Sequence, residues 1–261
     1  MTLVISKLIA GYKNFKLKSI SLEIETESFV ALIGPNGCGK STLLSSVGRL
    51  IEMQSGQIKI NDKDVSRLKI KDLARLVTIL PQSPVVPTAI TLEQLVHYGR
   101  APHQNLLGVK SKADRVAVEA ALEITDIIQF RDRFLSDLSG GQRQRAFVAM
   151  CLAQDTPYIL FDEPTSFLDL KYQYEIMDLI KSLTERGKTC LVVLHDIAQA
   201  ARYADHLIVM RDGFVAHQGS PKSTITSQML QQIYDIQATV YADPMTGTPN
   251  VSVIPRRPKS N

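Results

Sequence analysis

The chain has 261 residues, and its 44% hydrophobic and 21% charged content is typical of a folded globular protein with an adequate core. Its net charge of +4 is modest and no block of Lys and Arg is dense, so the composition argues against a nucleic-acid-binding protein. No apolar run approaches the ~20 residues of a membrane-spanning helix, the first residues lack a secretory-signal pattern, and the scattered Cys38, Cys151 and Cys190 favour a cytosolic protein with reduced thiols.

Apolar runs along the chain predict two layers of β structure and an inserted helical lobe. Short or alternating runs near the N-terminus predict an antiparallel layer with strands at 3–6, 20–24 and 57–60. More continuous runs predict a core sheet covered on both faces, with strands at 30–33, 77–80, 158–161, 191–194 and 207–210. Helical periodicity predicts helices at 41–50, 113–124, 142–153 and 228–233. A short tail rich in Pro, Thr and Val follows the last helix.

A glycine-rich turn lies between the apolar run at 29–33 and the first predicted helix. Glycines allow positive φ and close backbone approach, so N–H groups can converge on phosphate oxygens where the helix N-terminus adds partial positive charge. Lys40 can reach the β- and γ-phosphates, and the Ser41 hydroxyl can ligate Mg²⁺. Cys38 is a spacer in this turn, where the helix N-terminus would favour a lowered thiol pKa. The turn predicts a nucleoside-triphosphate site made of Gly34, Pro35, Asn36, Gly37, Cys38, Gly39, Lys40, Ser41 and Thr42.

Two carboxylates follow the apolar strand at 158–161. Adjacent strand residues point to opposite sides, so Asp162 and Glu163 need not have the same role. Asp162 is placed to hold Mg²⁺ together with Ser41, and Glu163 to orient and deprotonate an attacking water. Taken alone, the pair would be better interpreted as a helix N-cap followed by a solvated acid. The glycine-rich turn in the same chain favours the catalytic interpretation.

Ser139 opens another predicted helix within the string Leu138-Ser139-Gly140-Gly141-Gln142. Serine is a good N-cap and the two glycines permit backbone approach to an anion, although a glycine turn before a helix is also common as plain structure. The complete string resembles the signature sequence of the ATP-binding-cassette (ABC) ATPases. The Walker A and Walker B motifs of that family resemble residues 34–42 and 158–163.

Four further positions extend the resemblance to the ABC ATPases. Tyr12 resembles the aromatic residue that stacks on adenine, and Gln82 resembles the Q-loop glutamine that contacts Mg²⁺ and senses the membrane partner. The segment 166–169 resembles the D-loop; it has Phe167 where alanine is more usual and keeps Asp169. His195 resembles the switch histidine that contacts the γ-phosphate.

The resemblance implies an α/β fold: a P-loop NTPase core whose mixed sheet adjoins an antiparallel β subdomain, with an inserted α-helical subdomain. It implies one ATPase domain over 1–261, with the core and β subdomain at about 1–90 and 155–235, the helical subdomain at about 91–154 and a tail at 236–261. It also implies that ATP and Mg²⁺ bind between two copies of the chain, and that hydrolysis weakens the closed pair. In that arrangement the P-loop of one copy faces Ser139, Gly140, Gly141, Gln142 and Asp169 of the other.

Two segments resemble one group of importer ATPases. Residues 98–103 resemble the Gly-Arg-x-Pro-His segment of importers of iron chelates, haem and cobalamin. Residues 243–249 resemble the ferric-siderophore members, although Asp-Pro and Thr-Gly favour turns in any protein. The resemblance implies a bacterial ATP hydrolase at the cytoplasmic face of the membrane that energises uptake of ferric siderophores. Its partners would be a second ATPase subunit in a homodimer, two integral-membrane permease subunits and, indirectly, an extracytoplasmic substrate-binding protein, with no nucleic acid among them.

Other interpretations stay open at this point. The chain could serve a haem or cobalamin importer, or an exporter, against which residues 98–103 argue. A soluble ABC ATPase of translation or DNA repair usually carries two cassettes or a long coiled-coil insertion, and this sequence has neither. The intact Asp162, Glu163 and His195 argue against a regulator that binds nucleotide without hydrolysing it.

Overall fold

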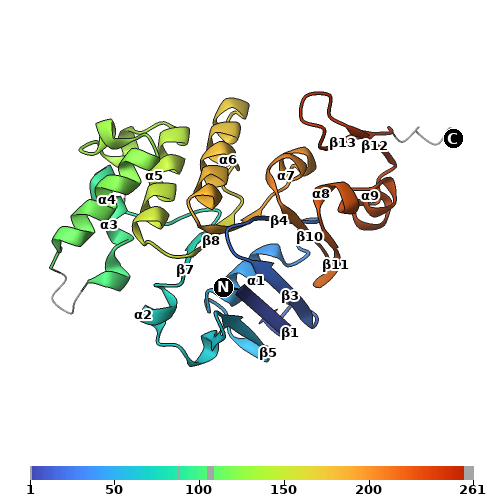
Figure 1. The fold of residues 1–261 in the computed structure, drawn as a ribbon, viewed down its shortest axis with the longest axis horizontal. Helices are drawn as coiled ribbons and strands as arrows, with labels where there is room; N and C mark the ends of the chain where they lie inside the picture. The colour runs from blue at the N-terminus through green and yellow to red at the C-terminus, as the bar shows by residue number, and fades with distance from the viewer. Residues whose placement is uncertain (1, 88, 105–108, 256–261) are drawn as a thin grey trace.

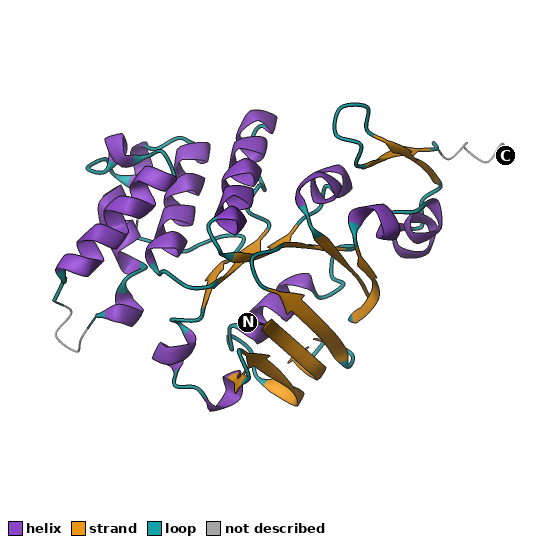
Figure 2. Cartoon of the chain, viewed as in Figure 1, coloured by secondary structure: helices purple, strands orange, loops and turns teal. Residues whose placement is uncertain are grey.

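The computed structural model of the protein describes residues 2–87, 89–104 and 109–255, and these residues form a mixed α/β fold (Figures 1 and 2). The predicted fold class is therefore confirmed. Across the described residues, none of the helices combines the length and the apolar composition needed to cross a bilayer. The helices described are α1 (Lys40–Val47), α2 (Ile70–Leu73), α3 (Leu92–Tyr98), α4 (Lys112–Ile124), α5 (Gly140–Ala153), α6 (Leu170–Glu185), α7 (Ile197–Tyr203), α8 (Pro221–Thr224) and α9 (Ser227–Tyr234).

A central sheet is built from the continuous apolar runs. Its strands, in their order across the sheet, are β11 (Phe214–Gly219), β10 (His206–Arg211), β4 (Phe29–Ile33), β9 (Thr189–Val193), β8 (Tyr158–Asp162) and β7 (Val77–Leu80). From β10 to β7 neighbouring strands run parallel, and β11 pairs antiparallel with β10 at one edge. Every residue of β4 and β9 is buried, as expected for strands covered on both faces.

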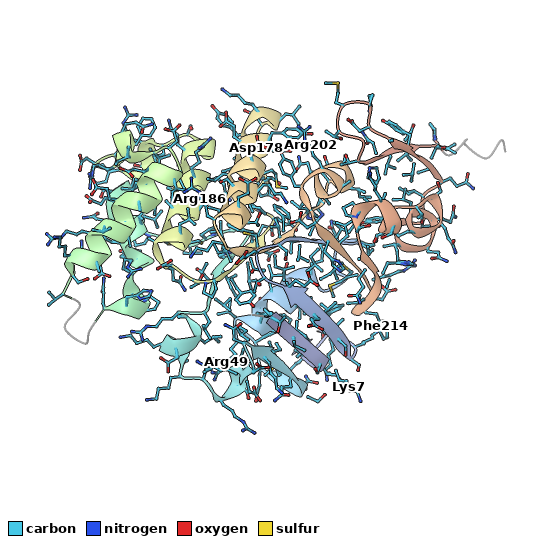
Figure 3. All side chains as sticks on the ribbon, in the orientation of Figure 1. Lys7, Arg49, Asp178, Arg186, Arg202 and Phe214 are labelled. Carbon is cyan, nitrogen blue, oxygen red and sulfur yellow. The ribbon has the colours of Figure 1, made fainter. Side chains whose placement is uncertain are left out.

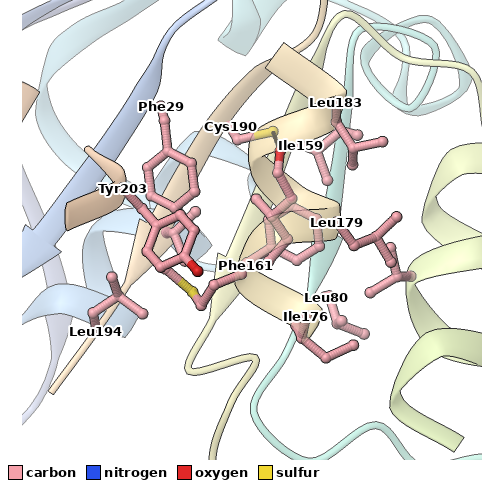
Figure 4. Close-up of a cluster of buried hydrophobic side chains, with 14 of the residues drawn as sticks. Phe29, Leu80, Ile159, Phe161, Ile176, Leu179, Leu183, Cys190, Leu194 and Tyr203 are labelled. Atoms are coloured by element: carbon pink, nitrogen blue, oxygen red, sulfur yellow. Dashed lines mark hydrogen bonds between the residues drawn. The ribbon is translucent and has the colours of Figure 1, made fainter. Parts of the chain in front are cut away.

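Alternate residues of β4 face two different hydrophobic cores. Val30 and Leu32 belong to the core that contains α1 and the antiparallel strands. Phe29 belongs to the other core, where its ring lies 6.4 Å from that of Tyr203 and α6 supplies further apolar side chains (Figure 4). Each large apolar side chain buried in this way stabilises the fold by about 1.5–3 kcal/mol. The sheet is thus the shared wall of both cores, which fixes the positions of its strand ends.

An antiparallel sheet packs beneath the central sheet in Figure 1. Its strands are β1 (Thr2–Tyr12), β2 (Phe15–Lys16), β3 (Ile20–Glu25), β5 (Met53–Ile60) and β6 (Lys63–Asp64). Buried and exposed residues alternate strictly along β3, the pattern of a strand with one face on a core. Leu3 pairs with both Ile24 and Ile60, and all three side chains are buried. The predicted antiparallel layer is confirmed.

A helical unit at the left of Figure 1 consists of α3, α4 and α5. Each of these helices begins with a capping box, in which the N-cap side chain and the side chain three residues later bind each other's backbone N–H groups. The N-caps are Thr91, Ser111 and Ser139. The helices predicted at 113–124 and 142–153 are confirmed as α4 and α5. The helix predicted at 41–50 is shorter, because it ends at Val47 before Gly48.

The C-terminal segment forms a hairpin that the sequence analysis did not predict. Strands β12 (Ala238–Ala242) and β13 (Pro249–Val253) pair antiparallel, with Val240 opposite Val251. The carboxylate of Asp243 accepts hydrogen bonds from the backbone N–H groups of Met245 and Thr246, each at 2.9 Å, which shapes the connecting turn. Strand β13 packs against α7, so the hairpin is attached to the core.

Candidate functional site

The predicted site residues gather where parallel strands end. In the sheet, β4, β9, β8 and β7 are neighbours and run in one direction, so their carboxyl ends lie at the same edge. Lys40 follows β4, Asp162 is the last residue of β8, Gln82 follows β7 and His195 follows β9. This edge is where ligands bind in open α/β sheets. Chain connectivity thus brings together side chains that are more than 150 residues apart.

Two glycines make the turn between β4 and α1 possible. Gly34 has φ 147°, and a Cβ atom there would lie only 2.2 Å from the carbonyl oxygen of Met210. Gly39 has φ 108°, and a Cβ atom there would lie 2.8 Å from a methyl group of Leu17 and 2.9 Å from the ring of Phe15. Larger residues are excluded at both positions, because the conformation is left-handed and the space is filled.

Lys40 is the first residue of α1 and points back over the turn. Only 6% of the residue is exposed, and its Nζ donates hydrogen bonds to the carbonyl oxygens of Gly34 (2.8 Å) and Pro35 (3.1 Å). The N-cap Gly39 supplies no side-chain acceptor, so the first N–H groups of α1 are available to a ligand. A buried cation beside a helix N-terminus is suited to a phosphate chain.

Cys38 does not behave as expected from its place before α1. It is 3% exposed, and burial raises the pKa of its thiol above the ordinary value despite the nearby Lys40 ammonium, which lowers it. The expectation of a lowered pKa is therefore wrong. The physical reason is that desolvation of the thiolate outweighs the field of the helix and of the lysine. Cys38 is a packing residue of the turn.

Ser41 and Asp162 place two oxygen ligands suited to a hard cation next to each other. The Ser41 hydroxyl donates a hydrogen bond of 3.0 Å to Oδ1 of Asp162. Burial raises the pKa of the Asp162 carboxyl, and the adjacent Glu163 carboxylate raises it further. A cation at this point would offset the repulsion between the two carboxylates. One hydroxyl and one carboxylate fit Mg²⁺, which usually takes one or two protein oxygens and completes its shell with phosphate oxygens and water.

Glu163 is held by donors from three segments. Its Oε2 accepts hydrogen bonds from Nε2 of Gln82 (2.5 Å) and from the hydroxyl of Ser166 (3.0 Å). Its Oε1 contacts Nε2 of His195. Its backbone has φ 53°, a left-handed conformation that costs a non-glycine residue on the order of 1 kcal/mol and is concentrated at functional sites. The contacts with Gln82, Ser166 and His195 hold the carboxylate in place and offset the cost of the left-handed backbone.

A cavity of about 690 Å³ opens onto these groups. Tyr12 lies at its edge and is 58% exposed, so a ring face is available for stacking on a base. Phe15 also lines the cavity, and the sequence analysis missed it and the Ser166 contact. The signal for Phe15 is its position three residues after Tyr12, in the strand that pairs with the end of β1. The lining residues are Tyr12, Phe15, Asn36, Gly37, Gly39, Lys40, Ser41, Thr42, Gln82, Glu163 and His195.

The signature segment and Asp169 lie elsewhere. Ser139 to Gln142 and Asp169 are not among the described residues that line this cavity. The Ser139 hydroxyl accepts a hydrogen bond from Gln142 N (3.3 Å), and Gln142 Oε1 accepts one from Ser139 N (3.0 Å). Gly141 leaves room for Tyr172, whose ring would lie 2.6 Å from an added Cβ atom. Asp169 is the N-cap of α6 and makes no side-chain capping bond. Ser139, Gly140 and Asp169 are exposed, Gln142 is half-buried and Gly141 is buried, so this segment lies apart from the cavity of its own chain.

The sequence comparisons place the chain among transport proteins. The sequence model described as "ABC transporter" matches residues 17–166. The ferric enterobactin transport ATP-binding protein FepC of Escherichia coli is 41% identical over 94% of this chain and 91% of its own. The probable siderophore transport system ATP-binding protein YusV of Bacillus subtilis is 43% identical over 89% and 85%. The iron(3+)-hydroxamate import protein FhuC of Bacillus subtilis is 40% identical over 89% and 87%.

Solved structures share the fold. A putative metal-chelate type transporter in an inward-facing conformation matches with a TM-score of 0.85, covering 98% of both chains at 24% identity. The ATP-binding cassette MJ0796, as a dimer bound to ADP and phosphate, matches with a TM-score of 0.72 at 30% identity, covering 84% of this chain and 98% of its own.

Proposed function

This chain belongs to the ABC transporter family, and we propose that it is the ATP-hydrolysing subunit of a bacterial importer of ferric siderophores. The observation that carries the hydrolytic part is the convergence of Lys40, Ser41 and Glu163 on one cavity, with Asp162 hydrogen-bonded to Ser41. The relatives named for siderophore transport support the substrate class, since they are about 40% identical over nearly the whole chain.

The residues divide the chemistry between them. Backbone N–H groups at the start of α1 and the Lys40 ammonium hold the phosphate chain; Lys40 then exchanges its carbonyl partners for phosphate oxygens. Ser41, Asp162 and Gln82 would hold Mg²⁺, which supplies neutralisation of charge between the phosphates. Glu163 orients a water molecule and takes its proton, and His195 contacts the γ-phosphate once Glu163 releases it.

Two copies of the chain complete one site. Ser139, Gly140, Gly141, Gln142 and Asp169 lie apart from the cavity of their own chain, which supports their role in the site of a second copy. In that role the N-terminus of α5 adds partial positive charge at the γ-phosphate. Binding of ATP closes the pair of chains and hydrolysis opens it, so the bound nucleotide shifts the equilibrium between the closed and the open pair. We propose a homodimer.

An apolar groove is the proposed contact with the permease. It measures about 440 Å³ and lies beside Arg49, which Figure 3 labels. Ile70 and Leu50 line it and are 80% and 67% exposed, so they are free to cover an apolar partner. The groove also borders β7, which leads directly to Gln82. We propose that a cytoplasmic helix of the permease docks near Gln82 and residues 91–103, with this groove as part of the contact.

The remaining proposals concern organisation. We propose one ATPase domain over 1–261, with the core and β subdomain at about 1–90 and 155–235, the helical subdomain at about 91–154 and a tail at 236–261. The chain would work at the cytoplasmic face of the membrane, bound to two permease subunits that receive the siderophore from an extracytoplasmic binding protein.

The substitution Glu163→Gln tests the hydrolytic mechanism. It keeps the shape and removes the base, so turnover should fall by about 10²–10⁴-fold while MgATP binding is retained and a closed dimer accumulates. Phosphate release and the oligomeric state with MgATP measure the two effects. Glu123→Gln, an exposed position on α4, is the matched control. An unchanged rate of phosphate release in Glu163→Gln contradicts the general-base role.

Uptake by a deletion strain tests the substrate class. Restoration of ferric-siderophore uptake by the unsubstituted chain, and not by Glu163→Gln, is the expected result. Restoration of haem or cobalamin uptake alone overturns the siderophore assignment.

A further inference from the structure

The segment Gly99–His103, which does not line the nucleotide cavity, closes the end of α5. A helix leaves its last carbonyl groups without partners inside the helix. Here Nη1 of Arg100 donates to the carbonyl oxygen of Ala153 (2.6 Å), and Nε2 of His103 bonds that of Gln154 (2.8 Å). Gly99 allows the approach, because a Cβ atom there would lie 2.1 Å from the carbonyl oxygen of Met150.

Arg100 also ties this point to α4. Its Nε donates to Oδ1 of Asp114 at 2.9 Å, and both side chains are almost fully buried. Asp114 belongs to the capping box of α4, where its other oxygen accepts hydrogen bonds from Ser111. Removing either partner would leave a buried charge without its counter-ion, so the two side chains stay paired in the folded protein. The three helices of the helical unit therefore meet at the C-terminal end of α5.

Gln154 carries the connection across to the central sheet. The Thr78 hydroxyl donates to its Oε1 (2.6 Å), while its Nε2 donates to the carbonyl oxygens of Ala74 (2.7 Å) and Val77 (3.2 Å). One half-buried amide thus joins the helical unit to β7 and to the link before it. We call this cluster of Gln154, Thr78, Ala74 and Val77 the joint. All four residues also line the groove beside Arg49, so a partner bound in that groove would contact the joint.

Two rigid elements leave this joint toward the two halves of the composite site. Strand β7 begins at the joint and ends two residues before Gln82, which bonds Glu163 of the same chain. Helix α5 ends at the joint, and its other end begins after Ser139. With 14 residues the helix is about 21 Å long. A tilt of about 3° at the joint therefore moves Ser139 by roughly 1 Å, a misplacement that costs on the order of 100-fold in rate.

We infer that Gln154 is a positioning residue for ATP hydrolysis. Its hydrogen bonds fix α5 relative to β7, so that Gln82 is placed in the site of its own chain and Ser139 is placed in the site of a second copy. The inference rests on the proposed function, because it assumes that Ser139 serves the site of a second copy. Gln154 is not among the described residues that line the nucleotide cavity. Its substitution should lower turnover and leave the binding of MgATP, which depends on Lys40 and the turn before α1, unchanged.

The test compares the rate and the affinity of the full-length chain with MgATP. Gln154→Leu removes all three side-chain hydrogen bonds at similar volume, and Gln129→Leu makes the same change at an exposed residue outside the joint. Thr78→Val removes one bond, and Thr78→Ser restores the hydroxyl. We expect kcat per bound ATP to fall about tenfold in Gln154→Leu and about threefold in Thr78→Val, with KM and Kd for MgATP within about twofold. Thr78→Ser and Gln129→Leu should match the unsubstituted chain.

The outcomes separate the joint from the proposed function. Unchanged kcat in Gln154→Leu and Thr78→Val, in a chain that hydrolyses ATP and needs Glu163, overturns the inference alone. Absence of hydrolysis by the unsubstituted chain overturns the proposed function. A loss of active sites, seen as fewer bound ATP per chain at normal kcat, identifies a merely structural role and also overturns the inference. If Gln154→Leu does not fold, the Thr78→Val and Thr78→Ser pair decides in the same way.

Discussion

Helices α1 and α5 both have glycines at their start, yet the two helix starts are built differently. The N-cap of α1 is Gly39, which offers no side-chain acceptor. The first residues of this helix line the cavity, and the first of them, Lys40, is buried. The N-cap of α5 is Ser139, whose capping box with Gln142 satisfies N–H groups from within the chain. Ser139 is exposed and Lys40 is not.

The difference shows how one type of element can serve two tasks. An uncapped helix start inside a cavity is a receptor for phosphate, because its N–H groups and its lysine need partners. A capped helix start on the surface is stable by itself and can approach a ligand that another chain already holds. Under the proposed function, α1 therefore determines affinity for ATP and α5 determines turnover. Substitutions at the two N-termini should separate these quantities.

Among substitutions at the two helix starts, the largest expected effect is that of Ser139→Arg. Under the proposed function, a large side chain at the N-terminus of α5 would keep a second copy from closing on the triphosphate, so hydrolysis should fall by at least about 100-fold, as for removal of a preorganised electrostatic contact. Binding of MgATP to the single chain should stay unchanged. Phosphate release and equilibrium binding measure the two quantities. Ser111→Arg, at the equivalent N-cap of α4, is the control. Loss of ATP binding by the single chain in Ser139→Arg would contradict the composite site.

The next effect is that of Lys40→Ala, which acts on affinity. Loss of a charged hydrogen-bond donor costs about 1.5–3 kcal/mol, so the Kd for MgATP should rise by about 10- to 100-fold. Lys112→Ala is a matched control, since Lys112 is the first residue of α4 as Lys40 is of α1. Titration with MgATP checks the result. Equal affinities for the two variants would remove the distinction between the two helix starts.

The smallest effect separates capping from catalysis. Ser139→Ala and Ser111→Ala each remove an N-cap from a capping box, so each should lower the free energy of unfolding by about 1 kcal/mol. Urea denaturation measures this loss. Only Ser139→Ala should also slow hydrolysis, because under the proposed function Ser139, and not Ser111, approaches the triphosphate of a second copy. A rate reduced to the same extent in both variants would mean that Ser139 acts through stability.

Periodicity and motifs predicted most of the architecture. The continuous apolar runs became the parallel strands, since only a strand buried on both faces tolerates a sequence such as 29–33. The hairpin at β12 and β13 escaped prediction, because Pro249 and the turn residues after Asp243 suggested an irregular tail. Its strands exist because Val240 and Val251 pair across a short turn, which depends on contacts between residues that local propensity does not weigh.

For the site, the order of strands along the chain predicted which side chains lie close together. Local sequence patterns did not predict the hydrogen bonds between them. The strand-end rule brings Lys40, Asp162 and His195 to one edge, as the hypothesis requires. The Ser166–Glu163 hydrogen bond depends on the left-handed backbone at Glu163, which no sequence pattern indicates. The pKa of Cys38 was predicted with the wrong sign, because the sequence shows the helix N-terminus and not the burial of the thiol.

The base end of the cavity has a consequence for substrate range. Tyr12 and Phe15 line it with aromatic rings. Stacking against a flat ring favours any nucleobase almost equally, because every base has a π face and the contact does not read the edges. Under the proposed function, discrimination between adenine and guanine by such a surface is small. The proposed nucleotide site should therefore accept guanine nearly as well as adenine.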